Sequence, residues 1–369
     1  MKKRISVVKS KILTADDLVL PLLEAYYQAR RHKRNTVNQL QFELSLEQSI
    51  YDLSRELSSR TYDLRPSICF INETPVKREI IAANFRDRVV HHLLCNWICP
   101  IFDRQFIHDC YSCRVGRGTD FAVSRAKYFM VSESRDFTRE CWSLRLDISG
   151  FFMGIHRDIL YQLCVEGLSR GKWAGVPDKD LCMFLLKKFI YNNPLDNAIF
   201  RSPPSAWNDL PLNKSLRGTS VNCGLPIGNL TSQWFGNIYL NRLDQFVKHQ
   251  LKIRCYGRYV DDMLLVHHDK SVLLEAIFKI RDYLKSRLHL NLNEKKTRLQ
   301  PIQKGFPMLG AYILPYRTYP GRRTVKNFVE CVKNPCRDED KQKSRVQSYL
   351  GYMGHYNAYR LTQSIQQGT

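Results

Sequence analysis

The chain has 369 residues, 44 % of them hydrophobic, which is enough for one large core or two to three smaller packed units. Its 57 lysines and arginines outnumber 35 acidic residues and give a formal net charge of +22, which favours a nucleic acid as partner over an anionic membrane. No apolar run reaches the length of about 18 residues that a membrane helix needs, and no long apolar stretch follows the first residues. We therefore expect a cytoplasmic protein with no membrane partner.

Twelve cysteines raise the question of metal or disulfide chemistry. Only Cys110 and Cys113 have the C-x-x-C spacing of a metal-ligand pair, and no second pair follows at zinc-finger distance. Without an export signal, reduced thiols are expected. The cysteine pattern therefore disfavours a zinc site and a disulfide framework.

Hydrophobic periodicity predicts helices alternating with short strands. Helices are expected over residues 14–60, 86–97, 158–192, 232–251, 277–288 and 348–359. Extended segments are expected over 65–82 around a turn at Thr74 and Pro75, at 144–148, in a hairpin over 254–266, and at 288–292. Residues 193–222, rich in Pro, Asn and Ser, are expected to form a loop or insertion. This order predicts an α+β core with helical attachments.

Two adjacent acids, Asp261 and Asp262, interrupt an apolar and aromatic segment that runs from Arg254 to Val266. In a buried strand pair, acids belong at the turn, where they can reach water or metal. Because side chains alternate along a strand, we expect one acid to point into a site and the other to support it. An ordinary Asp-Asp turn is the alternative interpretation of this motif alone.

A third acid, Asp147, closes the apolar strand at 144–148 and precedes the turn Gly150–Phe152. Carboxylates from neighbouring strand ends can hold two Mg²⁺ ions about 4 Å apart, which clamp the entering and leaving oxygens of a phosphoryl transfer. Oxygen ligands and a phosphate substrate both favour Mg²⁺. Asp147, Asp261 and Asp262 are therefore the candidate catalytic and metal-binding residues.

Several further motifs follow one another in a distinctive order: Lys77–Ile80, Phe85–Val90, Tyr111–Arg114, Asp147–Phe152, Gly224–Gln233, Tyr259–Asp262, Lys295–Lys296 and Met308–Gly310. With these motifs in register over roughly residues 20–314, the chain resembles the reverse transcriptase family. The resemblance implies an α+β right-hand polymerase. Its fingers and the start of its palm would occupy 1–140, the palm 141–314, and a helical thumb 315–369. The palm would be an antiparallel sheet with helices and would carry the insertion at 193–222.

The resemblance also implies roles for single residues. Asp147 and Asp261 would ligate two Mg²⁺ ions, with the carbonyl of Ile148 as a further ligand and Asp262 alongside; Mn²⁺ would be able to substitute. Phe152 would be a steric gate whose ring occupies the space of a ribonucleotide 2′-hydroxyl. Packing of this ring in the core is the alternative interpretation.

Three basic residues would contact the incoming nucleotide. Arg78 and Arg114 would hold the triphosphate, because the guanidinium fork suits phosphate. Lys296, or its neighbour Lys295, would lie near the leaving pyrophosphate. For each of them, an ordinary solvated surface charge is the alternative. The family more often has Pro-Lys-x-Arg at the fingers motif, whereas Val76 separates Pro75 from the lysine here.

The second palm motif separates subfamilies. Most family members have Gln-Gly-x-x-x-Ser-Pro, whereas this chain has Ile227 and Gly228 followed by Ser232 and Gln233. This form resembles the enzymes of diversity-generating retroelements. Gly228 would let the backbone approach the nucleotide closely. An apolar Ile227 in place of a polar residue would loosen base selection, because a polar contact discriminates better than shape alone; simple packing of Ile227 is the alternative.

The resemblance implies an RNA-directed DNA polymerase of bacterial or phage origin, whose partners are template RNA, a cDNA primer strand and dNTPs. In the retroelement group such enzymes copy RNA with errors at adenines, the cDNA rewrites a variable gene, and a small basic accessory protein takes part. A bacterial reverse transcriptase of a phage-defence or retron system remains an alternative. A catalytically silent RNA-binding module on the same fold is a second alternative. A metal nuclease that uses the same acids is a third, although the sequence contains no cluster that resembles a nuclease domain.

Overall fold

The structure is a computed structural model that describes residues 11–31, 35–74 and 76–367. Residues 32–34, and Pro75 of the expected turn, lie outside these residues. The chain forms two compact units, each assembled from three stretches. The first unit comprises Met1–His108, Ile148–Gln245 and Arg281–Asn291, and the second comprises Asp109–Asp147, Phe246–Ile280 and Leu292–Thr369. Each unit therefore joins segments that are far apart in the sequence.

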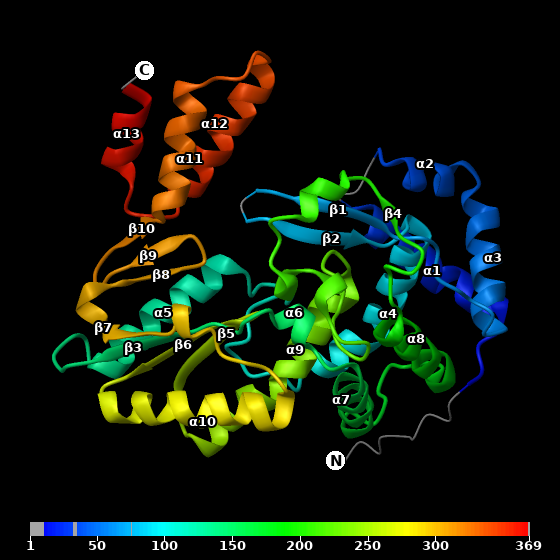
Figure 1. The fold of residues 1–369 in the computed structure, drawn as a ribbon, viewed down its shortest axis with the longest axis horizontal. Helices are drawn as coiled ribbons and strands as arrows, with labels where there is room; N and C mark the ends of the chain where they lie inside the picture. The colour runs from blue at the N-terminus through cyan, green and yellow to red at the C-terminus, as the bar shows by residue number, and fades with distance from the viewer. Residues whose placement is uncertain (1–10, 32–34, 75, 368–369) are drawn as a thin grey trace, which may run out of the picture. The chain divides into compact units, whose positions relative to one another are not determined.

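The first unit is mainly helical (Figure 1). Its helices are α1 (Ala15–Arg30), α2 (Val37–Leu44), α3 (Leu46–Ser58), α4 (Phe85–Asp103), α6 (Phe151–Gly154), α7 (Arg157–Arg170), α8 (Lys179–Tyr191) and α9 (Leu230–Gln245), joined by the last residues of α10 (Lys270–Leu288). A capping box fixes the start of α1: the Thr14 hydroxyl accepts from the Asp17 amide, and the Asp17 carboxylate accepts from the Thr14 amide. Helix α1 then packs against α3 and α4.

A three-stranded sheet completes this unit, in the order β2-β1-β4. Strands β1 (Ile68–Asn72) and β2 (Arg78–Ala82) are antiparallel, and the short β4 (Ile199–Phe200) is parallel to β1. The buried Glu79 of β2 accepts hydrogen bonds from Trp207 Nε1 at 2.7 Å, Ser215 Oγ at 2.8 Å and the Leu216 amide at 2.8 Å. The expected loop at 193–222, which contains short 3-10 turns, is therefore anchored to β2 by a satisfied buried carboxylate.

The second unit contains two antiparallel sheets. The larger has the order β5-β6-β3-β7, with β3 at Trp142–Leu146, β5 at Cys255–Tyr259, β6 at Asp262–His267 and β7 at Arg298–Pro301. Helix α5 (Thr119–Ser134) packs against β5 and β6, so the alternating apolar residues of the strands meet a core that includes Phe129 and Val266. The smaller sheet joins β8 (Phe306–Met308), β9 (Ala311–Ile313) and β10 (Thr318–Pro320).

Three helices end the second unit: α11 (Arg322–Lys333), α12 (Glu339–Met353) and α13 (Tyr359–Gln367). They close around the buried side chains of Phe328, Met353 and Ala358. Together the helices and antiparallel sheets of the two units confirm the expected α+β class. The predicted boundaries at 140 and 314 stay predictions. Among the residues that the structure describes, none of the helices combines the length and the hydrophobicity of a membrane span.

Two expected elements were wrong. Residues 288–292 do not form a strand, because His289 adopts a left-handed φ of 51° directly after α10. A single helix over 348–359 was also expected, but α12 ends at Met353 and α13 begins at Tyr359. Asn357 fixes this break: its amide donates to the Thr318 carbonyl at 2.8 Å, and its Oδ1 accepts from the Thr318 amide at 2.9 Å.

Candidate active site

The three aspartates lie in the second unit, at one end of neighbouring strands. In the antiparallel ladder between β3 and β6, Leu146 pairs with Met263. Asp147 follows Leu146 and Asp262 precedes Met263, so the two acids leave adjacent strands at the same end of the sheet. Asp261 stands one residue earlier, in the turn between β5 and β6.

The hairpin turn is strained and firmly held. Tyr259 pairs with Asp262, which leaves Val260 and Asp261 as the turn, and Val260 adopts a positive φ of 54°. Such a φ is unfavourable for a β-branched residue and persists only where surrounding contacts impose it. The fully buried Arg258 donates from Nη1 to the Val260 carbonyl at 2.7 Å, and the Val260 amide donates to Ser112 Oγ at 3.3 Å. The buried Arg258 therefore holds the turn and, through it, the backbone position of Asp261.

The carboxylates repel one another. Burial, together with the charges of Asp262 and Asp147, raises the pKa of Asp261 to about 7. Partial desolvation and the neighbouring Asp147 also raise the pKa of Asp262, although this side chain reaches the surface. Negative charges that are close together in a partly desolvated site repel one another unless a cation neutralises them. Carboxylate oxygens are ligands that a hard divalent ion prefers. The three acids therefore fit a magnesium-type site.

Two residues from the segment before β7 hold Asp147, which is only 6 % exposed. Lys296 Nζ donates to Asp147 Oδ1 at 2.8 Å, and Asn293 Nδ2 donates to Oδ2 at 2.9 Å. The Asn293 amide also donates to the Asp147 carbonyl at 2.8 Å. Both carboxylate oxygens of Asp147 are thus oriented, and one positive charge offsets part of the cluster's negative charge.

An open pocket of about 200 Å³ adjoins these acids. It is lined by Asp147, Asp262, Arg145, Leu146, Lys295, Lys296 and Arg298. Arg145 and Arg298 face one another across the β3–β7 ladder. Carboxylates that can hold a cation and basic groups that can hold phosphate therefore share one pocket.

Arg114 lies in the same unit but is buried, and its Nη1 donates to the Cys110 carbonyl at 3.0 Å. Its proposed role at the triphosphate stays a prediction. Cys110 is buried and Cys113 is exposed.

The other candidate residues belong to the first unit, whereas the three aspartates belong to the second. Ile148 is buried directly after Asp147. Phe152 and Ile227 are half-buried and pack against one cluster that includes Ile81 and Met153. Figure 1 shows α6, the short helix that carries Phe152, near the green helix α9 of the same unit. Phe152 and Ile227 thus share one packing environment.

Gly228 approaches the backbone of β2. Its φ is 130°, and a Cβ added there would meet the Ile81 carbonyl oxygen at 3.0 Å. The Ile81 amide also donates to the Ile227 carbonyl at 2.8 Å. Close packing against β2 is therefore a structural reason for glycine here, independent of any nucleotide. The exposed Arg78 begins the same strand.

Gly228 and Gln233 line a pocket of about 460 Å³ in the first unit. Arg31 and Arg88 are among its other lining residues, so the pocket is basic.

Sequence reasoning missed Asn293, Arg145 and Arg298. Asn293 stands two residues before the pair Lys295–Lys296, which the family resemblance singled out, but a lone asparagine gives no signal of its own. Arg145 sits in the apolar strand before Asp147, where a charged residue between leucines was a usable signal.

The chain is similar to several known proteins. A family model described as reverse transcriptase (RNA-dependent DNA polymerase) matches residues 74–313. Protein YkfC of Escherichia coli (strain K12) is 24 % identical over 276 residues, which cover 66 % of this chain and 65 % of that protein. The chain thus spans about 65 % of the length of this curated relative.

Solved structures also resemble the chain. Truncated apo telomerase from Candida tropicalis matches with a TM-score of 0.48 and 12 % identity, over 73 % of this chain and 60 % of that one. Telomerase from Candida albicans in complex with a fragment of telomeric RNA matches with a TM-score of 0.48 and 12 % identity, over 82 % of this chain and 55 % of that one.

Proposed function

Because the chain belongs to the reverse transcriptase family, we propose that it is an RNA-directed DNA polymerase that copies a template RNA into cDNA. The observation that carries the proposal is the meeting of Asp147 with Asp261 and Asp262 at one end of adjacent strands. Carboxyl groups whose pKa values are raised by burial and by each other are typical of sites built for chemistry. The net charge of +22 supports a template and a primer as polyanionic partners.

We assign Asp147 and Asp261 as ligands of two Mg²⁺ ions, with the Ile148 carbonyl and Asp262 beside them; Mn²⁺ would be able to substitute. When bound, the ions would lower the pKa of the primer 3′-hydroxyl and stabilise the charge on the transferred phosphoryl group. The reaction joins the 3′-oxygen to the α-phosphorus of a dNTP and releases pyrophosphate. No protein nucleophile is required.

Basic side chains of the chain would orient the triphosphate. Lys296, once its contact with Asp147 is given up to a cation, would face the leaving pyrophosphate. Arg78 is exposed and free to move toward a phosphate through its long side chain. Arg114 would have to leave its bond with the Cys110 carbonyl to do the same. Phe152 would exclude ribonucleotides by occupying the space of the 2′-hydroxyl.

The finer proposal is that the enzyme makes errors at template adenines within a diversity-generating retroelement. Ile227 supports it, because an apolar side chain in this motif removes a polar contact that would help to discriminate bases. Its packing with Phe152 in one cluster supports a place beside the base or sugar. A phage-defence or retron enzyme is the alternative, and a small basic accessory protein is a further proposed partner.

Primer extension tests the polymerase. With a primed RNA, dNTPs and Mg²⁺, we expect the protein to extend the primer, Asp261→Asn to remove incorporation, and RNA binding to stay nearly intact in that variant. Asp209→Asn is the matched control, because the Asp209 side chain is 92 % exposed, and it should extend the primer like the wild type. Wild-type activity in Asp261→Asn would reject the site.

The rivals give other outcomes. A silent RNA-binding module would bind RNA and extend nothing, and a metal nuclease would shorten the primer or template. Sequencing the cDNA separates the finer proposals: substitutions concentrated at template adenines support the retroelement function, and faithful cDNA contradicts it. Ile227→Gln should lower the adenine error frequency if the apolar side chain causes it.

A further inference from the structure

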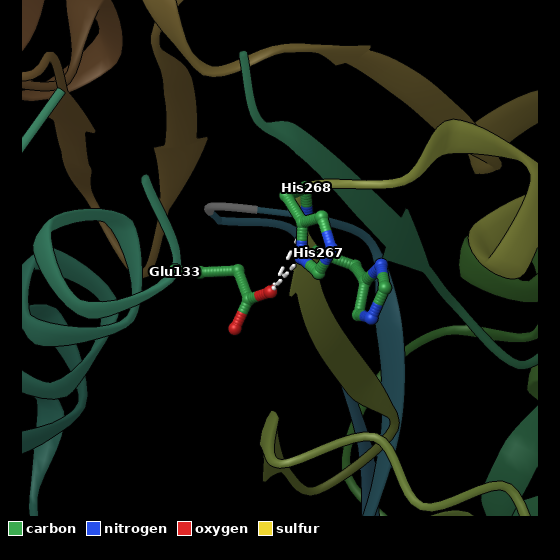
Figure 2. A group of neighbouring side chains, drawn as sticks. All are labelled: Glu133, His267 and His268. Carbon is green, nitrogen blue, oxygen red and sulfur yellow. Dashed lines mark hydrogen bonds and ion pairs between the residues drawn. The ribbon is translucent and has the colours of Figure 1, made fainter. Parts of the chain in front are cut away.

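A second group of possible metal ligands lies in the second unit, away from the aspartates. Glu133 near the end of α5, His267 at the end of β6, and His268 just after it each offer one ligand atom, and these atoms lie within 4.8 Å of one another. Figure 2 shows the Glu133 carboxylate pointing toward the two imidazole rings. The rings stack with centroids 4.4 Å apart and planes at 22°. Side chains from two separate elements therefore converge on one point.

The strand register separates this group from the catalytic acids. Trp142 of β3 pairs with His267, whereas Leu146 at the other end of the same ladder pairs with Met263 beside Asp262. These pairs are four residues apart along each strand, which corresponds to roughly 14 Å at about 3.4 Å per residue. The two groups therefore occupy opposite ends of one pair of strands.

The donors are suited to a transition metal rather than to Mg²⁺. Two imidazoles and one carboxylate form the set that Zn²⁺ and similar ions accept, whereas Mg²⁺ requires mostly oxygen ligands. The Asp269 amide donates to His267 Nδ1 at 3.0 Å, and the Asp269 carbonyl oxygen lies 3.2 Å from the same nitrogen. Binding of a metal by Nε2 would require the proton to move to Nδ1, which would then donate to the Asp269 carbonyl and give up the bond from the amide; this is the usual arrangement of a metal-bound histidine.

The alternative for His268 and Glu133 is a plain ion pair. His268 Nδ1 and Glu133 Oε1 are 2.6 Å apart, and Arg139 Nη2 lies 3.5 Å from the same oxygen. A bound metal would need these ligand atoms to separate slightly, because atoms about 2.1 Å from one tetrahedral ion lie further apart than this. His268 is exposed and His267 half-buried, so rotation of their rings meets little resistance.

Buried Cys255 contacts the carboxylate from the other side, with Sγ 3.8 Å from Glu133 Oε2. The thiol donates to Oε2, so Oε1 is the oxygen that faces the imidazoles. The buried thiol thus orients Glu133.

We propose that Glu133, His267 and His268 bind one transition-metal ion of the Zn²⁺ class, with solvent completing the coordination. The ion would tie the end of α5 to the end of β6 and the residue that follows it, because its ligands come from both. It would stabilise the sheet that carries the aspartates and would take no part in the chemistry. This inference does not depend on the proposed polymerase function.

The test is a Zn²⁺ titration of the whole protein in saturating Mg²⁺, monitored by competition with a chromophoric chelator. We expect one Zn²⁺ per chain, and affinity lower by on the order of 100-fold in Glu133→Gln and in His268→Asn, because each variant removes one ligand. His249→Asn, which changes an exposed histidine of the same unit, should bind like the wild type. Zn²⁺ should raise the melting temperature of the wild type and of His249→Asn only.

Magnesium-dependent primer extension in each variant, or the circular dichroism spectrum should the chain not polymerise, verifies that the variants fold. Failure of the wild type to take up Zn²⁺ would show that Glu133 and His268 form an ion pair only and would overturn the proposal. Uptake that Glu133→Gln and His268→Asn leave unchanged would overturn it equally.

Discussion

Asn293 donates two hydrogen bonds to Asp147, one from its backbone amide to the Asp147 carbonyl at 2.8 Å and one from Nδ2 to Oδ2 at 2.9 Å. The pair fixes both the chain path and the carboxylate orientation of the residue that ends β3. An unsupported carboxylate would rotate freely and would be slower to adopt the geometry that a cation needs.

Asn293→Ala should therefore lower the rate of nucleotide incorporation by about tenfold, with a smaller change in KM for the dNTP. Single-turnover primer extension measures this, and a raised Mg²⁺ requirement should accompany it. Asn334→Ala, at the end of α11, is the matched control and should keep the wild-type rate. An Asn293→Ala enzyme with wild-type rate and metal requirement would show that the contact is only structural.

Lys296 and Lys295 are adjacent and both exposed, but Lys296 is the one placed 2.8 Å from Asp147 Oδ1. If Lys296 serves the leaving pyrophosphate, Lys296→Met should reduce the incorporation rate by about 100-fold, as the loss of one charged donor in an active site does. Lys295→Met should change the rate by less than about fivefold, because an exposed charge contributes under about 1 kcal/mol. Equal effects in the two variants would assign both lysines to general attraction of nucleic acid.

The raised pKa of Asp261, about 7 against 3.8 for a free side chain, predicts a pH dependence of metal binding. Below about pH 7 the metal-free site holds a proton that a cation must displace, so the apparent Mg²⁺ affinity should fall by about tenfold per pH unit there and level off above it. Calorimetric Mg²⁺ titrations at about pH 6 and about pH 8 would measure this difference. An affinity that is flat across this range would contradict the raised pKa.

The same shift has a consequence for folding. A carboxyl whose pKa is higher in the folded state binds a proton more tightly there, so the metal-free protein should lose stability as pH rises from about 4 to about 7. Mg²⁺ should restore stability most at the upper end of that window. Thermal melts with and without Mg²⁺ across the window would show the sign.

Phe151 and Phe152 are neighbours with different surroundings, and they form a matched pair. Phe151 is 3 % exposed, so Phe151→Ala should destabilise the fold by about 3–5 kcal/mol. Phe152 is only half-buried, so Phe152→Ala should cost less stability and instead admit ribonucleotides. The ratio of dNTP to rNTP incorporation measures the discrimination against ribonucleotides. An unchanged ratio in Phe152→Ala would show that Phe152 is a core residue and not a steric gate.

Much of this protein was predictable from local sequence. Apolar periodicity located most helices and both strands of the 254–266 hairpin, because burial of one face imposes a regular spacing. The three aspartates were identifiable because each acid interrupts or ends an apolar strand segment. Burial of a carboxylate there is energetically unfavourable unless it is paired or binds a cation. The α+β class followed from the order of the elements.

The rest depended on contacts between distant segments. The ladder that pairs Leu146 with Met263, the bonds of Asn293 to Asp147, and the support of Val260 by the buried Arg258 join residues that no local pattern connects. The convergence of Glu133 with His267 and His268 likewise needed the packing of α5 on the sheet. Sequence periodicity reports which face of an element is buried, whereas strand register and helix packing decide which side chains meet, and only the tertiary structure sets those.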